Sequence, residues 1–186
     1  MSQLAAQSIK KLCEGETPMI YPFHEDKIVI NGKSAGLSAA SYDCRINHDL
    51  VLGVNPAHVI AKAIMDDWPR HRLQQALKDN PPMTALAHTV EDFHFPDNVS
   101  GAVCDKSSYA RIFVSAFNTF FDPGFRGNAT LELVNLGTEP VRYKAGDPVC
   151  QFIFHWLDQA SDRPYAGKYQ DQPKGSQPAI HEEALA

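Results

Sequence analysis

Hydrophobic positions change their spacing along the chain, and each change predicts a different kind of element. Residues 3–13 carry apolar side chains at helical spacing among good helix formers, and Gly15 ends that segment. Short runs of β-forming residues follow at 19–21, 27–30, 42–46 and 50–52. The first part of the chain therefore predicts one short helix followed by strands.

A helical pattern returns over residues 58–78, where Ala, Ile, Met and Leu recur at helical spacing among Lys and Gln. Pro69 lies inside this stretch and cannot donate a backbone hydrogen bond, so two helices are expected rather than one. Asn80-Pro81-Pro82 closes the stretch. The sequence predicts a helical insert between strands.

From residue 84 onward the pattern is that of strands separated by turns. The expected strands are 84–89, 99–103, 112–116, 130–135, 141–143 and 149–155. Gly, Pro, Asn and Asp separate these strands at short intervals, which indicates a sandwich or a barrel. Residues 1–157 are expected to form one mainly β domain.

Residues 158–186 have no apolar period and are rich in Gln, Asp, Pro, Gly and Lys. Composition alone predicts a disordered tail. Two tyrosines, a lysine and two glutamines within residues 164–172 also suit a lid that closes over a ligand.

Composition limits the class of protein. With 186 residues, 44% hydrophobic and 21% charged, the chain is an ordinary soluble domain. Its net charge of -5 disfavours a nucleic-acid polymer as partner but allows an anionic small molecule. No stretch is long enough to cross a membrane and no signal pattern opens the chain, so a cytoplasmic protein without a membrane partner is expected. The four scattered cysteines favour free thiols in a reducing compartment.

Zinc chemistry has little support. The eight histidines show no HExxH spacing, and the HxE and PCxxC signature of zinc deaminases is absent. The chain also lacks GxGxxG, Walker A and GxSxG motifs. No zinc is expected.

Two segments carry candidate chemistry. Residues 106–111, KSSYAR, place two hydroxyls between two cations, which suits either phosphate binding or an ordinary charged turn. In the strand 130–134, Thr130, Glu132 and Val134 face one side, opposite Leu131 and Leu133. Glu132 is then either a solvated strand residue or an acid/base held in a pocket.

Taken in order, several short motifs resemble those of the dCTP deaminases, which are relatives of the trimeric dUTPases. They are SYDCR at 41–45, ALAHTVE followed by Phe95-Pro96, KSSYAR at 106–111, DPGFRG and TLE within 122–132, and GKYQ at 167–170. Each motif alone is a weak signal. Together the motifs occur in the order found in the family and cover most of the chain outside residues 55–80.

This resemblance implies a distorted, jelly-roll-like β-barrel of the dUTPase type, assembled as a homotrimer with active sites between subunits. It implies that Glu132 and Arg111 are catalytic, and that a deoxynucleoside triphosphate carries Mg²⁺ on its own phosphates. It places Asp122 against the deoxyribose and the tail over the triphosphate. The residues implied to bind substrate are Lys106, Ser107, Ser108, Tyr109, Ala110, Arg111, Asn118, Asp122, Thr130, Leu131, Tyr165, Lys168 and Gln172.

Deamination suits these residue types, because one carboxylate can activate water for attack at C4 and then protonate the departing amine. Arg111 can orient the water or balance charge. The segment between Arg111 and Asp122 is two residues shorter than the deaminase pattern and reads FNTFF at 117–121, where the family reads the base. Three functions therefore stay open: dCTP deamination, pyrophosphate release from dUTP with or without deamination, and non-catalytic nucleotide binding.

Overall fold

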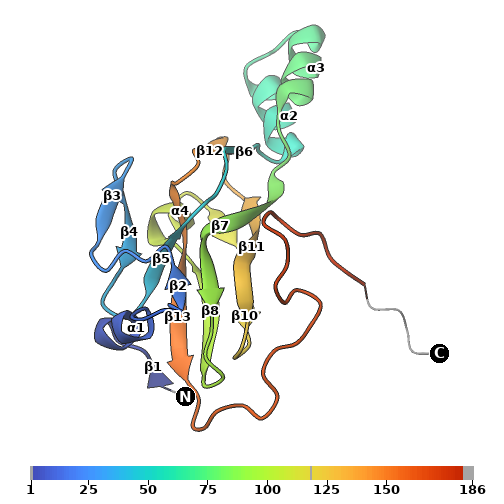
Figure 1. Cartoon of the computed structure of the whole chain (residues 1–186). Coiled ribbons are helices and arrows are strands. Elements are labelled where there is room, and N and C mark those ends of the chain that lie inside the picture. Colours follow the sequence, from blue (N-terminus) through green and yellow to red (C-terminus); the bar gives the residue numbers. More distant parts are fainter. Residues whose placement is uncertain (1, 118, 182–186) are drawn as a thin grey trace, which may run out of the picture.

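Alternating burial along the longer strands builds two sheets that face each other across an aromatic core. The computed structural model describes residues 2–117 and 119–181 (Figure 1). The larger sheet has the strand order β10 (Phe120–Phe121), β8 (Val99–Asp105), β13 (Pro148–Trp156), β5 (Tyr42–Arg45), β4 (Lys33–Leu37) and β3 (Ile28–Ile30), with β1 (Ser2–Gln3) also paired to β13.

The second sheet carries the strand that the sequence singled out. Its order is β2 (Ile20–Tyr21), β7 (Thr84–His94), β11 (Arg126–Asn135) and β9 (Val114–Ala116). A short ribbon of β12 (Val141–Tyr143) and β6 (Leu50–Leu52) lies at one end. The prediction of a mainly β, barrel-like domain is confirmed.

Phenylalanines from both sheets meet in the core. Phe93 of β7 stacks on Phe152 of β13 with ring centroids 4.5 Å apart, and Phe95 meets Phe154 edge-on at 5.7 Å. Each such ring stabilises the fold by roughly 1.5–3 kcal/mol when it leaves water. Leu131 and Leu133 of β11 belong to the same core, so the alternate residues of that strand face away from it.

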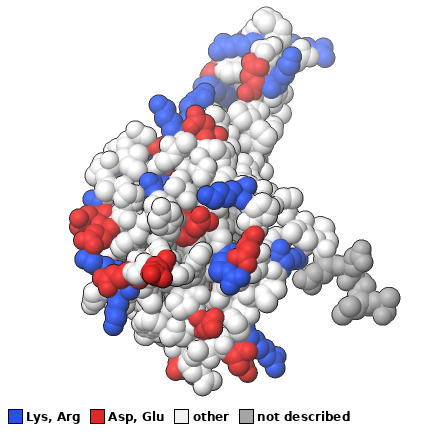
Figure 2. Space-filling view, in the orientation of Figure 1, with Lys and Arg blue, Asp and Glu red and all other residues white. Residues whose placement is uncertain are grey.

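The expected helices form. α1 (Ala6–Leu12) packs Ile9 into the core, and the insert becomes α2 (Pro56–Met65) and α3 (Arg70–Asp79), separated at Pro69 as predicted. Together α2 and α3 form an arm that projects from the barrel, and Figure 2 shows Lys and Arg side chains gathered on it. The guanidinium of Arg72 on α3 lies 4.0 Å from the centre of the ring of Trp68, which is in the link between the two helices.

The base of the arm is closed by side-chain and backbone contacts. The Asn80 amide donates to the carbonyl of Val54 at 2.8 Å, and its oxygen accepts from the Val54 N–H at 3.1 Å. Gly53 passes close to the returning chain, since a β-carbon there would lie only 1.9 Å from the carbonyl oxygen of Pro81. The two ends of the insert therefore lie side by side.

Four elements were not expected from the sequence, one of them the two-residue strand β1, whose Gln3 lies in the stretch predicted as helix. β4 contains Ser34, Ala35 and Gly36, which have weak strand preference, and it forms because β3 and β5 flank it. α4 (Ser107–Ala110) and β10 are single-turn or two-residue elements, too short to produce a period. β7 also runs to His94, five residues beyond its expected end at Thr89, because it pairs with β11 along its length.

The described part of the tail, residues 158–181, has no helix or strand, yet it is hydrogen-bonded to the barrel (Figure 1). The N–H of Tyr165 donates to the carbonyl of Pro123 at 2.7 Å, and that of Asp171 donates to the carbonyl of Arg126 at 3.1 Å. Composition predicted disorder here, but the backbone of β11 and its preceding turn provides the partners that order this segment.

The four cysteines are free, as expected. Burial raises the pKa of the Cys13 thiol to about 12, which keeps that sulfur protonated at neutral pH. No helix within the described ranges is long and apolar enough to cross a membrane.

Candidate functional site

A pocket of about 280 Å³ lies between the tail and strand β11. It is lined by Leu86, Thr119, Phe120, Phe121, Asp122, Phe125, Thr130, Glu132, Tyr165, Tyr169, Gln172, Gln177 and Ala179. Five of these were candidates from the sequence: Asp122, Thr130, Glu132, Tyr165 and Gln172. The pocket therefore joins the strand, the turn before it and the tail, which are distant in sequence.

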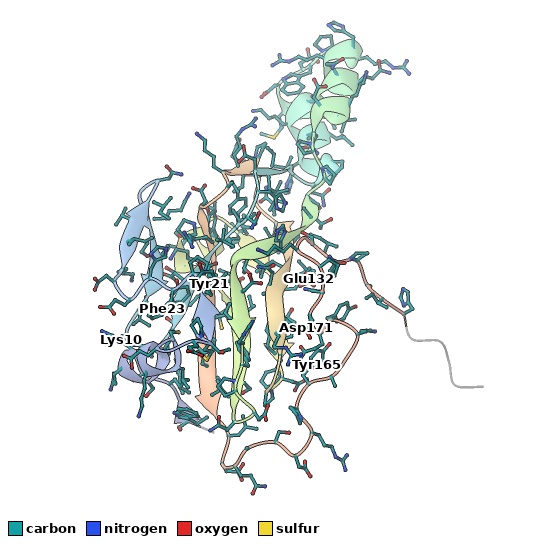
Figure 3. The ribbon with its side chains drawn as sticks, viewed as in Figure 1. Lys10, Tyr21, Phe23, Glu132, Tyr165 and Asp171 are labelled. Carbon is teal, nitrogen blue, oxygen red and sulfur yellow. The ribbon has the colours of Figure 1, made fainter. Side chains whose placement is uncertain are left out.

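Strand alternation places Glu132 in this pocket. Leu131 and Leu133 on β11 are buried in the core, so Thr130 and Glu132 point to the opposite face. Figure 3 shows Glu132 on β11, with Tyr165 and Asp171 on the tail beside it. Val134 shares this strand face with the carboxylate, but it is buried and does not line the pocket.

The segment before Asp122 forms one wall. Its backbone is tied to both sheets, since the N–H of Phe117 donates to the carbonyl of Glu132 at 2.9 Å and the carbonyl of Thr119 accepts from Val103 at 3.0 Å. The Thr119 hydroxyl lies 3.3 Å from Oε2 of Glu132. Asn118, expected to read the base, lies outside the described residues.

The turn after Asp122 brings the tail close. Gly124 has a φ of +81°, and a β-carbon there would lie 2.7 Å from the side chain of Pro164. Glycine at this position thus serves both the turn and the approach of the tail. Tyr165 follows directly, with its ring 5.9 Å from that of Phe125.

Tail residues then cross the open face of β11. Gln172 donates to the carbonyl of Asn128 at 2.9 Å, and the N–H of Gln177 lies 3.4 Å from the Thr130 hydroxyl. Oε1 of Gln172 is buried and has no hydrogen-bond partner among the described residues, so it can accept from a ligand. The Lys168 amine donates to the carbonyl of Ile180, and neither residue lines the pocket.

Segment 106–111 does not reach the pocket of its own chain. Nζ of Lys106 is buried 2.8 Å from Asp43 and 3.2 Å from Ser34, and the Tyr109 ring packs 4.7 Å from that of Tyr143. These two side chains belong to the core and lie away from the pocket because they pack against strands of the other sheet and the end ribbon. Leu131 is likewise a core residue. Ser107, Ser108, Ala110 and Arg111 are exposed and line no part of the pocket.

The electrostatic character of the pocket follows from its lining. Asp122 and Glu132 contribute two carboxylates, while no Lys, Arg or His side chain is among the described lining residues. A polyanion placed there would meet like charge unless cations came from elsewhere. The described residues also contain no group of three or more His, Cys, Asp and Glu side chains able to hold a metal ion.

Comparison with known proteins identifies the family. The model of the dCTP deaminase-like family matches residues 3–157. The chain belongs to this family. It is 34% identical over 185 residues to a dCTP deaminase of Granulibacter bethesdensis, covering 97% of this chain and 100% of that one. It is 32% identical over 176 residues to a dCTP deaminase of Campylobacter curvus, covering 89% and 91%.

Among solved structures, the dCTP deaminase-like chain is similar to a 2'-deoxycytidine 5'-triphosphate deaminase from Agrobacterium tumefaciens. The TM-score is 0.51 at 18% identity, and the match covers 82% of this chain and 47% of that one. At this identity the similarity concerns the fold alone, and it agrees with the arrangement of sheets described above.

Eight residues that line the pocket of the present dCTP deaminase-like protein were not proposed as site residues from the sequence. They are Leu86, Thr119, Phe120, Phe121, Phe125, Tyr169, Gln177 and Ala179. Pairing explains Leu86, which lies directly across from Glu132 on β7. Tyr169 belongs to the 164–172 stretch that was expected to suit a lid, whereas Gln177 and Ala179 had no signal in the sequence, because their position depends on contacts with β11. Thr119 could have been found from its place beside Asn118 in the irregular segment.

Proposed function

We propose that the protein deaminates dCTP to dUTP and releases ammonia, with Glu132 as acid/base and without zinc. The observation that carries this proposal is the position of Glu132 on β11, half-buried in the wall of a pocket otherwise rich in aromatic rings. A carboxylate at such a position can reach a base that stacks against those rings. Family membership supports the same reaction.

In the proposed mechanism, ionised Glu132 removes a proton from water while the water oxygen attacks C4 of cytosine. The bond to C4 forms, and the tetrahedral centre carries both the hydroxyl and the amine. Protonated Glu132 then gives its proton to the amine nitrogen, the C4–N bond breaks and ammonia leaves. The product first carries a C4 hydroxyl and an N3=C4 bond; its hydroxyl proton then moves to N3, which gives the C4 carbonyl and N3–H of uracil. Atoms therefore balance as dCTP + H₂O → dUTP + NH₃.

No cationic side chain is found among the described residues that line the pocket, which favours a homotrimer with shared sites. Ser107, Ser108 and Arg111 are exposed on one side of the subunit, next to exposed Ile112 and Phe113. In the proposal this surface meets the pocket of a neighbouring subunit, where the hydroxyls and Arg111 bind phosphate and steady the tetrahedral centre.

The remaining roles follow the same arrangement. Asp122 contacts the deoxyribose, while Tyr165, Lys168 and Gln172 close over the triphosphate. Mg²⁺ is held by the phosphates of the nucleotide. Mg²⁺ would neutralise phosphate charge.

Pyrophosphate release from dUTP, alone or after deamination, is the second candidate. It is favoured by the shortened segment between Arg111 and Asp122, which differs where the family reads the base. Non-catalytic nucleotide binding is less favoured, because a binder does not need an acid/base residue in its pocket.

The test is to incubate the purified protein with Mg²⁺ and each pyrimidine triphosphate, measuring ammonia and pyrophosphate separately. Ammonia from dCTP without pyrophosphate is expected. The Glu132→Gln variant should lose at least 10²-fold in kcat while still binding dCTP, since the amide keeps the shape but cannot transfer the proton. Turnover by this variant within a few-fold of wild type would mean that Glu132 is not the acid/base.

A further inference from the structure

The Thr119 hydroxyl lies within hydrogen-bonding distance of two acceptors. Its oxygen is 3.3 Å from Oε2 of Glu132 and 3.2 Å from the carbonyl oxygen of Phe117. A threonine hydroxyl has one proton to donate and two lone pairs to accept with. It therefore cannot fully serve both acceptors at once, but it can alternate between them.

We propose that Thr119 is a positioning residue that holds Glu132 in place in both of its protonation states. When Glu132 is ionised, Thr119 donates to Oε2, a bond strengthened by the charge. When Glu132 has taken the proton from water on its other oxygen, Thr119 still donates to Oε2, now the carbonyl oxygen of the acid, and the new O–H stays directed at the departing amine. The inference rests on the proposed role of Glu132 as acid/base.

The geometry around Thr119 is fixed well enough for this role. The carbonyl of Thr119 accepts from Val103 on β8, and the N–H of Phe117 donates to the carbonyl of Glu132 itself. The segment carrying the hydroxyl is thereby tied to the strand carrying the carboxylate. Thr119 is also β-branched, so its χ1 has few favourable values.

Other polar side chains in the pocket have different partners. Gln172 donates to Asn128, and Gln177 donates through its side chain to the carbonyls of Pro173 and Gly175. Thr130 is approached by both glutamine residues. Among the described residues, Thr119 is the side chain found hydrogen-bonded to Glu132.

The test compares Thr119→Val, which keeps the branched shape without the hydroxyl, with Thr119→Ser, which keeps the hydroxyl. Thr84→Val, on the exposed face of β7, is the control for the same substitution outside the pocket. In ammonia-release assays with dCTP we expect kcat of Thr119→Val to fall by about tenfold or more, with KM changed less than about threefold. Thr119→Ser should recover to within about threefold of wild type.

Several outcomes would overturn the inference. Wild-type kcat in Thr119→Val would show that the hydroxyl is not needed. A loss in Thr119→Ser equal to that in Thr119→Val, with both melting temperatures unchanged, would show that shape and not the hydroxyl matters. If Thr119→Val fails to fold, Thr119→Ser alone decides. A well-folded Thr119→Ser whose kcat falls tenfold, while the ratio of its kcat/KM values for different substrates stays as in the wild type, would also refute the inference. A wild type that releases no ammonia overturns the proposed function, and this inference with it.

Discussion

Lys106 and Asp43 bury opposite charges against each other beside α4. Their side chains are only 8% and 3% exposed, and the amine also reaches the Ser34 hydroxyl. Such a pair is costly to break from one side, because the remaining charge stays buried without a partner. The positive charge of Lys106, at the start of segment 106–111, is therefore paired inside the fold.

We expect Lys106→Met to destabilise the protein by about 3–5 kcal/mol, as single truncations of buried ion pairs do. Urea unfolding measures this change. The double variant Lys106→Met with Asp43→Leu serves as control and should regain much of the loss, because no unpaired charge remains. A stable Lys106→Met variant with weakened dCTP binding would instead assign the amine to the phosphates.

His88 on β7 stacks with His48 at a centroid distance of 5.3 Å, and its Nδ1 lies 3.4 Å from the hydroxyl of Ser176 in the tail. Burial, and then the neighbouring His48, lower the pKa of His88 below its usual value. Below about pH 6.5, the ordinary histidine value, the unfolded chain takes up a proton that the folded protein resists. Stability contributed by neutral His88 is therefore present at higher pH and lost as pH falls.

The variant His88→Gln should show a smaller decrease in melting temperature between pH 8 and pH 5.5 than the wild type, because it removes this proton uptake. At pH 8 the histidine is neutral in the folded and in the unfolded protein. The difference in melting temperature between variant and wild type at pH 8 therefore reports only the change in packing. Parallel curves for the two proteins would show that His88 does not contribute to the pH dependence.

At the scale of elements, the arm of α2 and α3 leaves and rejoins the barrel beside Gly53 and Asn80, and its Trp68 lines a shallow pocket together with residues 138–140 of the barrel. Asn80 forms both of its hydrogen bonds to the backbone of Val54, and Asn135 donates to the carbonyl of Gly53. The pocket beside β11 has no lining residue from the arm. The arm is therefore separable from the site in structural terms.

Replacing residues 56–79 with a short Gly/Ser linker should leave the barrel folded, with a melting temperature within several degrees of wild type. The ends already lie together, so closing a short loop costs little. Asn80→Ala, with the arm kept, should lose about 1–3 kcal/mol because Val54 is left with unpaired backbone groups. Circular dichroism and thermal unfolding measure both. Aggregation of the linker variant would mean that the arm covers part of the core.

Local patterns predicted the elements that depend on local chemistry. The two helices of the arm follow from a period interrupted by Pro69, and the orientation of Glu132 follows from alternation around Leu131 and Leu133. The burial of Lys106 could not be predicted, because its partner Asp43 is 63 residues away in sequence. The course of the tail could not be predicted either, since its order comes from bonds to the backbone of other elements.

At the scale of the whole molecule, the two halves of the proposed catalytic machinery lie apart within one chain. Glu132 lines the pocket, whereas Arg111 is exposed outside it. A closed ring of subunits in which each pocket meets the next subunit's Arg111 would unite them. The exposed Phe113, with 69% of its surface accessible, lies next to that segment and would be covered in such a ring.

Co-expression of two inactive variants, Glu132→Gln and Arg111→Ala, should therefore restore activity. In randomly mixed trimers about a quarter of the sites combine an intact Glu132 with an intact Arg111 from the neighbour, so about a quarter of the wild-type rate is expected. Light scattering on the wild type should give the mass of a trimer. No recovery in mixed trimers, with each variant folded, would place both residues in a site made by one chain.

The stacking of Arg72 on Trp68 in the arm gives the protein a built-in optical probe. The sequence contains two tryptophans, and the other, Trp156, ends β13 at the far side of the barrel. With phenylalanine at position 156, fluorescence emission would come from the arm alone. Unfolding followed by that emission can be compared with unfolding followed by calorimetry, whose heat scales with chain length and therefore comes mostly from the barrel. The separation of the two curves would measure how far the arm melts independently of the barrel.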